Sequence, residues 1–518
     1  MQRFKYTLAV VAITFLIISL LPDNVRSQSG RGRPRVPSRE PAKPPPPPPK
    51  VPAASALVKQ EQAGTTSRFL LKNGMTVIIS EQHAAPIAAA VAYVKAGKID
   101  EPEGASGVSS LLARIVMRGA PAANLRDMGA LSGAEATADG TAYYLAVAPG
   151  KIKEALAIQA DMLKSPPLAA EYVSREASLL AEGGDDREAM AFAAERAAGL
   201  ALADSRFGRA FRSDQSPGPI AGDRIAEFYR SAYRPEKLII SVAGDVSTFN
   251  TLIEIQRLYG DFDQTVEQPA PPKPVENPAI EKATQPKTPS PKTPPQAADK
   301  AAPKPAAPAT QASPEQAGAE QELAARLRYA AERGDTSQSI VTAAFRVPGL
   351  SSKESAALEL IAAIMGKGRG SRLYRSLVEG QPVANRVNAD YLAVAGEGLI
   401  VVQARAGAGL IDKAGSALFR ELDRLRRELV SEGELARART LLEKRFIDEI
   451  GTYRGRALWL ARAEAASGSF RAALDYRKAL SRVSAEDVQR AAARYFELAN
   501  TSVFEYEPLN APARTFDA

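Results

Sequence analysis

The sequence predicts an α+β protein made of two homologous halves, each an antiparallel-rich sheet covered by helices. Two observations support this prediction. Apolar patterns typical of a strand, a helix, a pair of helices and a closing strand occur in the same order in both halves. Between the halves, residues 264–322 contain no aromatic residue and consist mainly of Pro, Ala, Lys, Gln and Thr. Such a segment cannot bury enough apolar surface to fold, so it acts as a linker.

The composition of these regions indicates the domain organisation. At 518 residues the chain is long enough for two or three domains of ordinary size. We expect a signal peptide over residues 1–27, a Pro-rich disordered spacer over 28–64, an N-terminal domain over 65–263, the linker over 264–322, a C-terminal domain over 323–510 and a tail over 511–518.

The N-terminus has the pattern of a secretory signal. Arg3 and Lys5 precede an apolar run over residues 7–21, and Val25 and Ser27 occupy suitable positions before a cleavage site. As a helix this run would span about 22 Å, short of the ~30 Å hydrocarbon core of a bilayer. Its length favours cleavage, and the alternative is an uncleaved N-terminus that associates with the membrane. Both alternatives predict an exported protein, periplasmic or envelope-associated.

The overall composition excludes several classes of site. The net charge is +8, but Lys and Arg are scattered among acidic residues without an aromatic platform, so we expect no nucleic-acid partner. The absence of Cys excludes disulfides and thiol catalysis. With a single histidine, His83, which we place in a surface loop, the chain cannot assemble an imidazole- or thiolate-rich zinc site.

The first half begins with a hairpin and alternates strands with helices. In residues 68–82, RFLLKNGMTVIISEQ, two apolar runs flank an Asn-Gly turn. Further strands are expected at 87–94, 141–147 and 238–244, and helices at 108–118, at 151–164, over 170–203 with a break at Gly183-Gly184, and from 225 to the stop at Pro235.

The second half repeats this order. Strands are expected at 339–347 and 398–406, a helix at 354–365, helices over most of 408–497, and a closing segment to 508. Ser484 is a suitable helix N-cap, with Asp487 three residues further on.

The most informative stretch is residues 104–120, GASGVSSLLARIVMRGA. Its apolar residues Val108, Leu111, Leu112 and Ile115 have the spacing of one buried helix face. The stretch resembles the signature helix of the insulinase/pitrilysin zinc metallopeptidases (the inverzincins), which reads roughly G-x-A-H-x-x-E-H-M-x-F-x-G-T. The segment of residues 225–246, with its Tyr-Arg-Pro turn, and the run Gly370-Ser371-Arg372-Leu373-Tyr374 resemble other family segments. The resemblance covers about residues 66–263 and 323–508, and implies a two-domain bacterial or processing-peptidase-like member whose halves form a clamshell.

The resemblance implies that the catalytic helix has lost its chemistry. Aligned on its glycines, the first zinc histidine is Ser110, the catalytic glutamate is Ala113 and the second histidine is Arg114. Serine is a poor zinc ligand, alanine accepts no proton, and a guanidinium repels a cation. The family's third ligand is a glutamate on a later helix; Glu182 is the first candidate and Glu176 the alternative register, in either case as a relic. We therefore expect no cofactor, although zinc is the family's cofactor.

The second catalytic motif is degenerate as well. Active relatives use an Arg and a Tyr in L-R-E-x-x-G-L-A-Y, and the matching stretch here is LVEGQPVAN, residues 377–385. Val378 replaces the arginine and Asn385 replaces the tyrosine, so no strong donor is left to stabilise a developing oxyanion. In a shifted register, Arg375 or Arg386 could act nearby.

These features lead to one main hypothesis and two alternatives. The main hypothesis is an exported, non-catalytic peptidase homologue that pairs with a catalytic subunit carrying an intact zinc motif and helps enclose a peptide or unfolded polypeptide. The second is an envelope peptide-binding or scaffold module without peptidase activity. The third is an enzyme with altered chemistry, for which Ser110 has no neighbouring histidine base.

Overall fold

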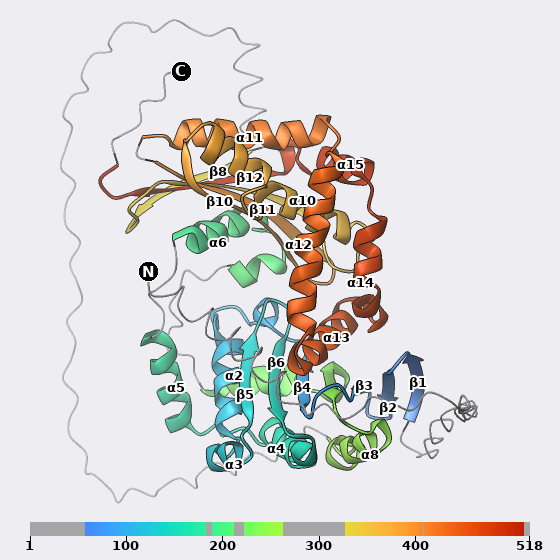
Figure 1. Cartoon of the computed structure of the whole chain (residues 1–518). Coiled ribbons are helices and arrows are strands. Elements are labelled where there is room, and N and C mark those ends of the chain that lie inside the picture. The colour runs from blue at the N-terminus through green and yellow to red at the C-terminus, as the bar shows by residue number, and fades with distance from the viewer. Residues whose placement is uncertain (1–56, 183–188, 212–221, 263–326, 408, 512–518) are drawn as a thin grey trace, which may run out of the picture. The chain divides into compact units, whose positions relative to one another are not determined.

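The computed structural model describes residues 57–182, 189–211, 222–262, 327–407 and 409–511 (Figure 1). The first half contains a seven-stranded sheet in the order β1-β2-β3-β7-β4-β6-β5. Only β3 and β7 run parallel; the other neighbours are antiparallel. Its strands are β1 (Leu57–Ala63), β2 (Thr66–Leu71), β3 (Thr76–Glu81), β4 (Ala88–Val94), β5 (Leu131–Ala136), β6 (Thr141–Val147) and β7 (Leu238–Gly244). Its helices are α2 (Val108–Arg118), α3 (Ala122–Asp127), α4 (Ile152–Lys164), α5 (Ala170–Glu182), α6 (Ala189–Ala201), α7 (Gly222–Ala232) and α8 (Thr248–Tyr259).

The second half contains a five-stranded sheet in the order β10-β11-β9-β12-β8, in which only β12 and β8 run parallel. Its strands are β8 (Arg328–Gly334), β9 (Ile340–Pro348), β10 (Ala384–Ala393), β11 (Glu397–Ala406) and β12 (Thr501–Pro508). Its helices are α10 (Ser355–Gly366), α11 (Ile411–Arg427), α12 (Glu432–Ile450), α13 (Tyr453–Ser467), α14 (Arg471–Arg482) and α15 (Ala485–Tyr495).

The two sheets share one topology. Reading β3-β7-β4-β6-β5 against β8-β12-β9-β11-β10 gives the same strand order, with the single parallel pair in the same place. In each half a helix follows the second of these five strands in chain order: α2 follows β4, and α10 follows β9. The last strand in chain order, β7 or β12, lies between the first and the second strand in the sheet. The predicted α+β fold with two related, helix-covered sheets is therefore confirmed.

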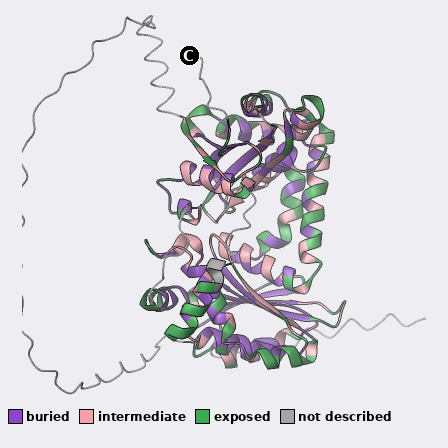
Figure 2. Ribbon diagram, turned by 90° about the vertical axis from the view of Figure 1, so that its left-hand side faces the viewer, coloured by how far each residue is buried: buried purple, intermediate pink, exposed green. Residues whose placement is uncertain are grey.

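Each half contributes one helix to the sheet of the other half. α6 packs on β8, β9, β11 and β12 of the second sheet, and α13 packs on β3, β4, β6 and β7 of the first (Figure 1). Along β4, Ala90 and Ala92 face the core of the first half, whereas Val91 and Tyr93 face α13. A strand covered on both faces is apolar at most positions, and β4 and β7 are buried throughout, with Ser241 the one polar residue between them. Figure 2 shows buried residues concentrated in the strands of the sheets.

Polar contacts accompany this exchange. The Arg68 guanidinium on β2 donates through Nε to Glu464 Oε1 on α13 at 2.7 Å, and Glu464 Oε2 accepts from the Phe470 amide at 2.9 Å. On the other side, Gln403 of β11 donates from Nε2 to the carbonyl oxygen of Met190 on α6 at 2.7 Å. The buried carboxylate of Glu464 and the buried amide of Gln403 thus find their partners across the two halves.

Most predicted elements are present, and four strands, β1, β5, β8 and β10, were not predicted. β1 lies inside the segment assigned to the spacer, so the boundary at residue 64 is wrong and ordered structure includes Leu57 onward. β1 is an edge strand with most of its side chains exposed, so its sequence LVKQEQA lacks the apolar alternation of a buried strand. The edge strands β5, β8 and β10, whose side chains are mostly partly or fully exposed, were missed for the same reason.

Several predicted segments lie outside the described residues. These are the signal peptide, most of the spacer, the linker at 264–322, the break at Gly183-Gly184 and the tail apart from residue 511. Within the part of the chain that is described, no helix is long and apolar enough to cross a membrane.

Candidate functional site: a former zinc helix

The helix with the family signature forms as predicted. α2 buries Val108, Leu111, Leu112 and Ile115 in the core of the first half. It begins after Gly107, whose φ of +88° favours glycine. The buried Glu101 carboxylate accepts from the amides of Gly107, at 2.8 Å, and Ser109, at 3.0 Å. These bonds satisfy free amides at the helix start and place a negative charge at the positive end of the dipole.

Of the degenerate positions, Ser110 and Arg114 lie on the partly exposed side of α2, and Ala113 faces the core. Ser110 is half-buried and Ala113 is buried, so neither offers a metal a basic nitrogen or a carboxylate. Arg114 lies one turn beyond Ser110, and Arg118 lies one turn beyond Arg114. Residues four apart share a helix face, so Ser110, Arg114 and Arg118 form a row of hydrogen-bond donors.

Glu176 on α5 faces this row. Its carboxylate is buried and accepts from Arg114 Nε at 3.3 Å and from Arg118 Nε at 2.7 Å. Of the two glutamates considered for the third ligand position, Glu176 is therefore the one that the structure brings against the former zinc helix. Glu182 ends α5, and its side chain is outside the described part of the structure.

The residues at this site do not fit zinc. A zinc site needs three or four lone-pair donors, and here a buried carboxylate is already paired with two guanidinium cations, which have no lone pair to give. Among the residues that the structure describes, no group of three His, Cys, Asp or Glu side chains could hold a metal ion. We therefore derive no catalytic step through a metal.

The single histidine lies in a surface loop, as predicted. His83 is 61% exposed, with Nδ1 2.6 Å from Asp245 Oδ1 and Nε2 3.2 Å from Glu81 Oε1. Hydrogen bonds to Asp245 and to Glu81 raise the pKa of the imidazole above its ordinary value. His83 thus links the end of β3 to the segment between β7 and α8 by hydrogen bonds. Neither of these two hydrogen bonds involves a residue of α2.

The second degenerate motif lies in the second half. Val378 belongs to a π-helical turn, Tyr374–Gly380, and Asn385 begins the exposed edge of β10. The Asn385 amide donates to Gln338 Oε1 at 2.6 Å, and its oxygen accepts from Arg405 Nε at 2.9 Å. Asn385 is thus tied to its own sheet by ordinary surface hydrogen bonds.

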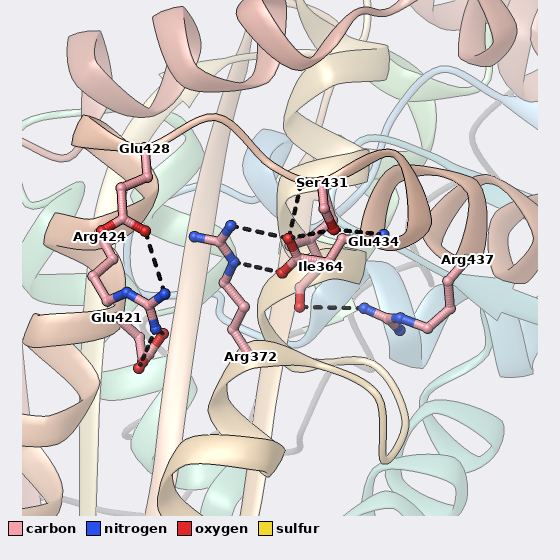
Figure 3. A network of polar contacts seen from close by, with 8 residues as sticks. All are labelled: Ile364, Arg372, Glu421, Arg424, Glu428, Ser431, Glu434 and Arg437. Atoms are coloured by element: carbon pink, nitrogen blue, oxygen red, sulfur yellow. Dashed lines mark hydrogen bonds and ion pairs between the residues drawn. The ribbon is translucent and has the colours of Figure 1, made fainter.

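Sequence reasoning missed the structural role of Arg372. This residue of the Gly-x-Ser-Arg-Leu-Tyr run binds Glu434 in a fork, with Nε 2.7 Å from Oε1 and Nη2 3.1 Å from Oε2 (Figure 3). Glu434 also accepts from the Ser431 amide at 3.0 Å and so caps α12. Burial by itself raises the pKa of Glu434, but Arg372 and Ser431 outweigh it and hold that pKa at about 2. The sequence signal was the Ser431–Glu434 capping-box spacing.

Arg437 adds to this network from the same helix. It donates from Nη1 to the Lys367 carbonyl oxygen at 3.0 Å and from Nη2 to the Ile364 carbonyl oxygen at 3.5 Å, the second of which is drawn in Figure 3. A Cβ atom on Gly370 would be only 2.8 Å from Cδ of Arg437. A side chain at position 370 would therefore force the Arg437 side chain to shift. The signature run of the second half joins α10 and α12.

The fold and site define a duplicated peptidase-like protein whose metal-binding helix has been replaced by an arginine-bearing one. Two family models match the chain: "Insulinase (Peptidase family M16)" over residues 76–199 and "Peptidase M16 inactive domain" over residues 219–442. Together they take in both halves. The chain belongs to the insulinase/pitrilysin family of M16 peptidases.

The probable mitochondrial-processing peptidase subunit beta of Schizosaccharomyces pombe is 24% identical over 213 residues, which are 39% of this chain and 47% of that protein. The match thus spans about half the length of this curated relative. Two solved structures share the fold at low identity. A protease from Helicobacter pylori is 17% identical, with a TM-score of 0.68 over 86% of this chain and 99% of that one. An M16 inactive domain from Pseudomonas fluorescens is 17% identical, with a TM-score of 0.63 over 88% and 99%.

Proposed function

We propose that this chain is a non-catalytic M16 homologue that serves as the partner subunit of a zinc-bearing homologue in peptide or protein processing. The observation that carries the proposal is the pairing of Arg114 and Arg118 with the buried Glu176. The family's metal chemistry requires a free carboxylate and two imidazoles near this position. Here the Glu176 carboxylate on α5 is neutralised by two cations from α2, so in the proposed complex the partner supplies the metal.

The similarity to known proteins supports a subunit role. The relative in Schizosaccharomyces pombe is named as one subunit of a processing peptidase, and one of the two family models describes an inactive domain. A retained fold with lost ligands is what a subunit needs if it contributes surface rather than chemistry. We further propose export to the periplasm or envelope, which rests on the N-terminal apolar run of the sequence.

A pull-down of the full chain from the native envelope fraction tests the partnership. We expect a stoichiometric companion that carries H-x-x-E-H, and the reconstituted pair should cleave peptides in a reaction that a chelator stops. Under the alternative of a peptide-binding or scaffold module, the chain comes down without such a companion. That result, together with a stable monomer in solution, would reject the proposed partnership.

The absence of catalysis is tested separately on the purified chain. We expect no stoichiometric zinc after dialysis against a zinc buffer and no peptide cleavage with zinc added. One equivalent of bound zinc, with cleavage lost in Glu176→Ala or Glu182→Ala, would show that the chain is an enzyme in its own right.

A further inference from the structure

The row of donors on α2 has more positive charge than its structural role requires. One guanidinium would neutralise the buried Glu176 carboxylate, yet both Arg114 and Arg118 bind it. The three charged groups together carry a net charge of +1. The arginine side chains are also 44% and 52% exposed, whereas that of Glu176 is 3% exposed. The surplus charge therefore faces solvent.

The manner of binding leaves the terminal guanidinium nitrogens available as donors. Both arginines hydrogen-bond Glu176 through Nε. Among the described residues, the terminal nitrogens Nη1 and Nη2 of each have no hydrogen-bond acceptor. Anchoring a guanidinium by Nε to a buried carboxylate fixes its plane, so the ordering cost of binding a ligand is reduced before the ligand arrives.

The geometry of the helix sets what ligand fits. Residues four apart on a helix have Cβ atoms roughly 5–6 Å apart, so the two guanidiniums and the Ser110 hydroxyl line one short strip. Arginine forks match a carboxylate, which can accept from two donors at once. Ser110 is half-buried beside them and has no hydrogen bond from its hydroxyl among the described residues, so it can donate a further bond.

We propose that the strip Ser110–Arg114–Arg118, anchored by Glu176, is a binding site for a carboxylate group of a peptide. The carboxylate can be the C-terminus of the peptide or an Asp or Glu side chain. The inference rests on the proposed role in peptide handling and deepens it. It assigns a preference for negatively charged peptides to the position on α2 that corresponds to the family's zinc site. It does not require the chain to have a partner.

Fluorescence anisotropy with the full chain and four matched peptides tests the site. The peptides share one sequence and a blocked N-terminus, and they differ in a free or amidated C-terminus and in two Glu or two Gln side chains. We expect a carboxylate-bearing peptide to bind roughly tenfold more tightly than the peptide without any, because the hydrogen bonds are charge-assisted but half-exposed. The two intermediate peptides show which source of carboxylate is used.

Variants locate the binding. Arg114→Gln and Arg118→Gln should each remove most of the tenfold preference, and Arg118→Lys should keep only part of it because the fork is lost. The matched control is Arg257→Gln. Arg257 is also an exposed arginine paired with a glutamate, in this case Glu254 on the same helix, α8. This variant removes the same charge far from α2 and should leave the preference unchanged. Thermal unfolding establishes that each variant is folded.

The possible outcomes are decisive. A preference that falls with the α2 variants, falls with added salt, and survives Arg257→Gln supports the site. Equal binding of all four peptides by the wild-type chain, absence of any binding, or the same loss with Arg257→Gln overturns it. If an α2 variant fails to fold, the wild-type comparison of the four peptides still decides. A failure here leaves the partnership intact, because that is judged by copurification and reconstituted cleavage.

Discussion

Replacing Arg372 by Met should destabilise the second half through the charge that it leaves on Glu434. The two side chains are 9% and 20% exposed, and the fork between them links the signature run after α10 to the start of α12 (Figure 3). Methionine keeps much of the apolar length of the arginine but donates nothing. The variant therefore removes the ion pair while preserving most of the packing.

The pKa of Glu434 gives the magnitude. A folded-state pKa of about 2 against an ordinary value of 4.5 corresponds to about 3 kcal/mol of stabilisation of the ionised form, at about 1.4 kcal/mol per pKa unit. Ser431 supplies part of this through its amide and hydroxyl, and both donors remain in the variant. We therefore expect Arg372→Met to lower the free energy of unfolding by about 2 kcal/mol at pH 7.

The pH dependence distinguishes this mechanism from lost packing. Because the pKa of Glu434 is lowered on folding, its contribution is fully present above pH 4.5 and is lost as the pH falls toward 2. Urea unfolding followed by circular dichroism should show the gap between wild type and variant closing over that range. A control, Arg257→Met, should show no such change. A loss below about 1 kcal/mol at pH 7, or an equal loss near pH 2, would refute the reasoning.

Three further predictions address other sites. His83 is the chain's only histidine, so its imidazole resonance can be followed by NMR without overlap. Because Asp245 and Glu81 raise its pKa, it should titrate with a midpoint above 6.5, and Asp245→Asn should lower that midpoint. An unchanged midpoint would mean that the pair of His83 and Asp245 does not form in solution. Restoring the family's helix tests which glutamate completes a zinc site. The variant combines Ser110→His, Ala113→Glu and Arg114→His. Zinc binding by this variant should weaken at least roughly tenfold with Glu176→Gln but not with Glu182→Gln, as measured by competition with a zinc indicator, and the reverse result would favour the other register. Finally, Ser484→Ala removes the N-cap of α15 and should cost about 1 kcal/mol in urea unfolding, with an effect near zero contradicting the cap.

Local patterns in the sequence were sufficient for most elements and for the loss of the zinc ligands. The Asn-Gly turn, the buried face of α2 and the capping box at Ser484 each depend on residues a few positions apart. Their physical causes, such as backbone sterics, helical periodicity and caps, act over the same short range. The identity of Ser110, Ala113 and Arg114 likewise predicts the loss of the zinc ligands, because ligand chemistry belongs to the side chain itself.

Edge strands were beyond this reasoning. β1, β5, β8 and β10 have mixed or exposed faces, so burial imposes little apolar alternation on their sequences. They are strands because a neighbouring strand offers hydrogen-bonding partners. Their own sequences therefore do not show that they will form strands. The same holds for Arg372, whose motif was visible but whose partner Glu434 is 62 residues away.

What only the tertiary structure decided is which surfaces meet. The sequence predicted helices over 170–203 and over most of 408–497, but not that α6 and α13 would each cover the sheet of the opposite half. In the same way, the sequence offered Glu182 and Glu176 on one helix, and packing of α5 against α2 brought Glu176 to Arg114 and Arg118. Hydrophobic burial is non-directional, so a sequence determines that a face is buried, whereas the partner and the resulting charge pairs depend on the shape of the whole fold.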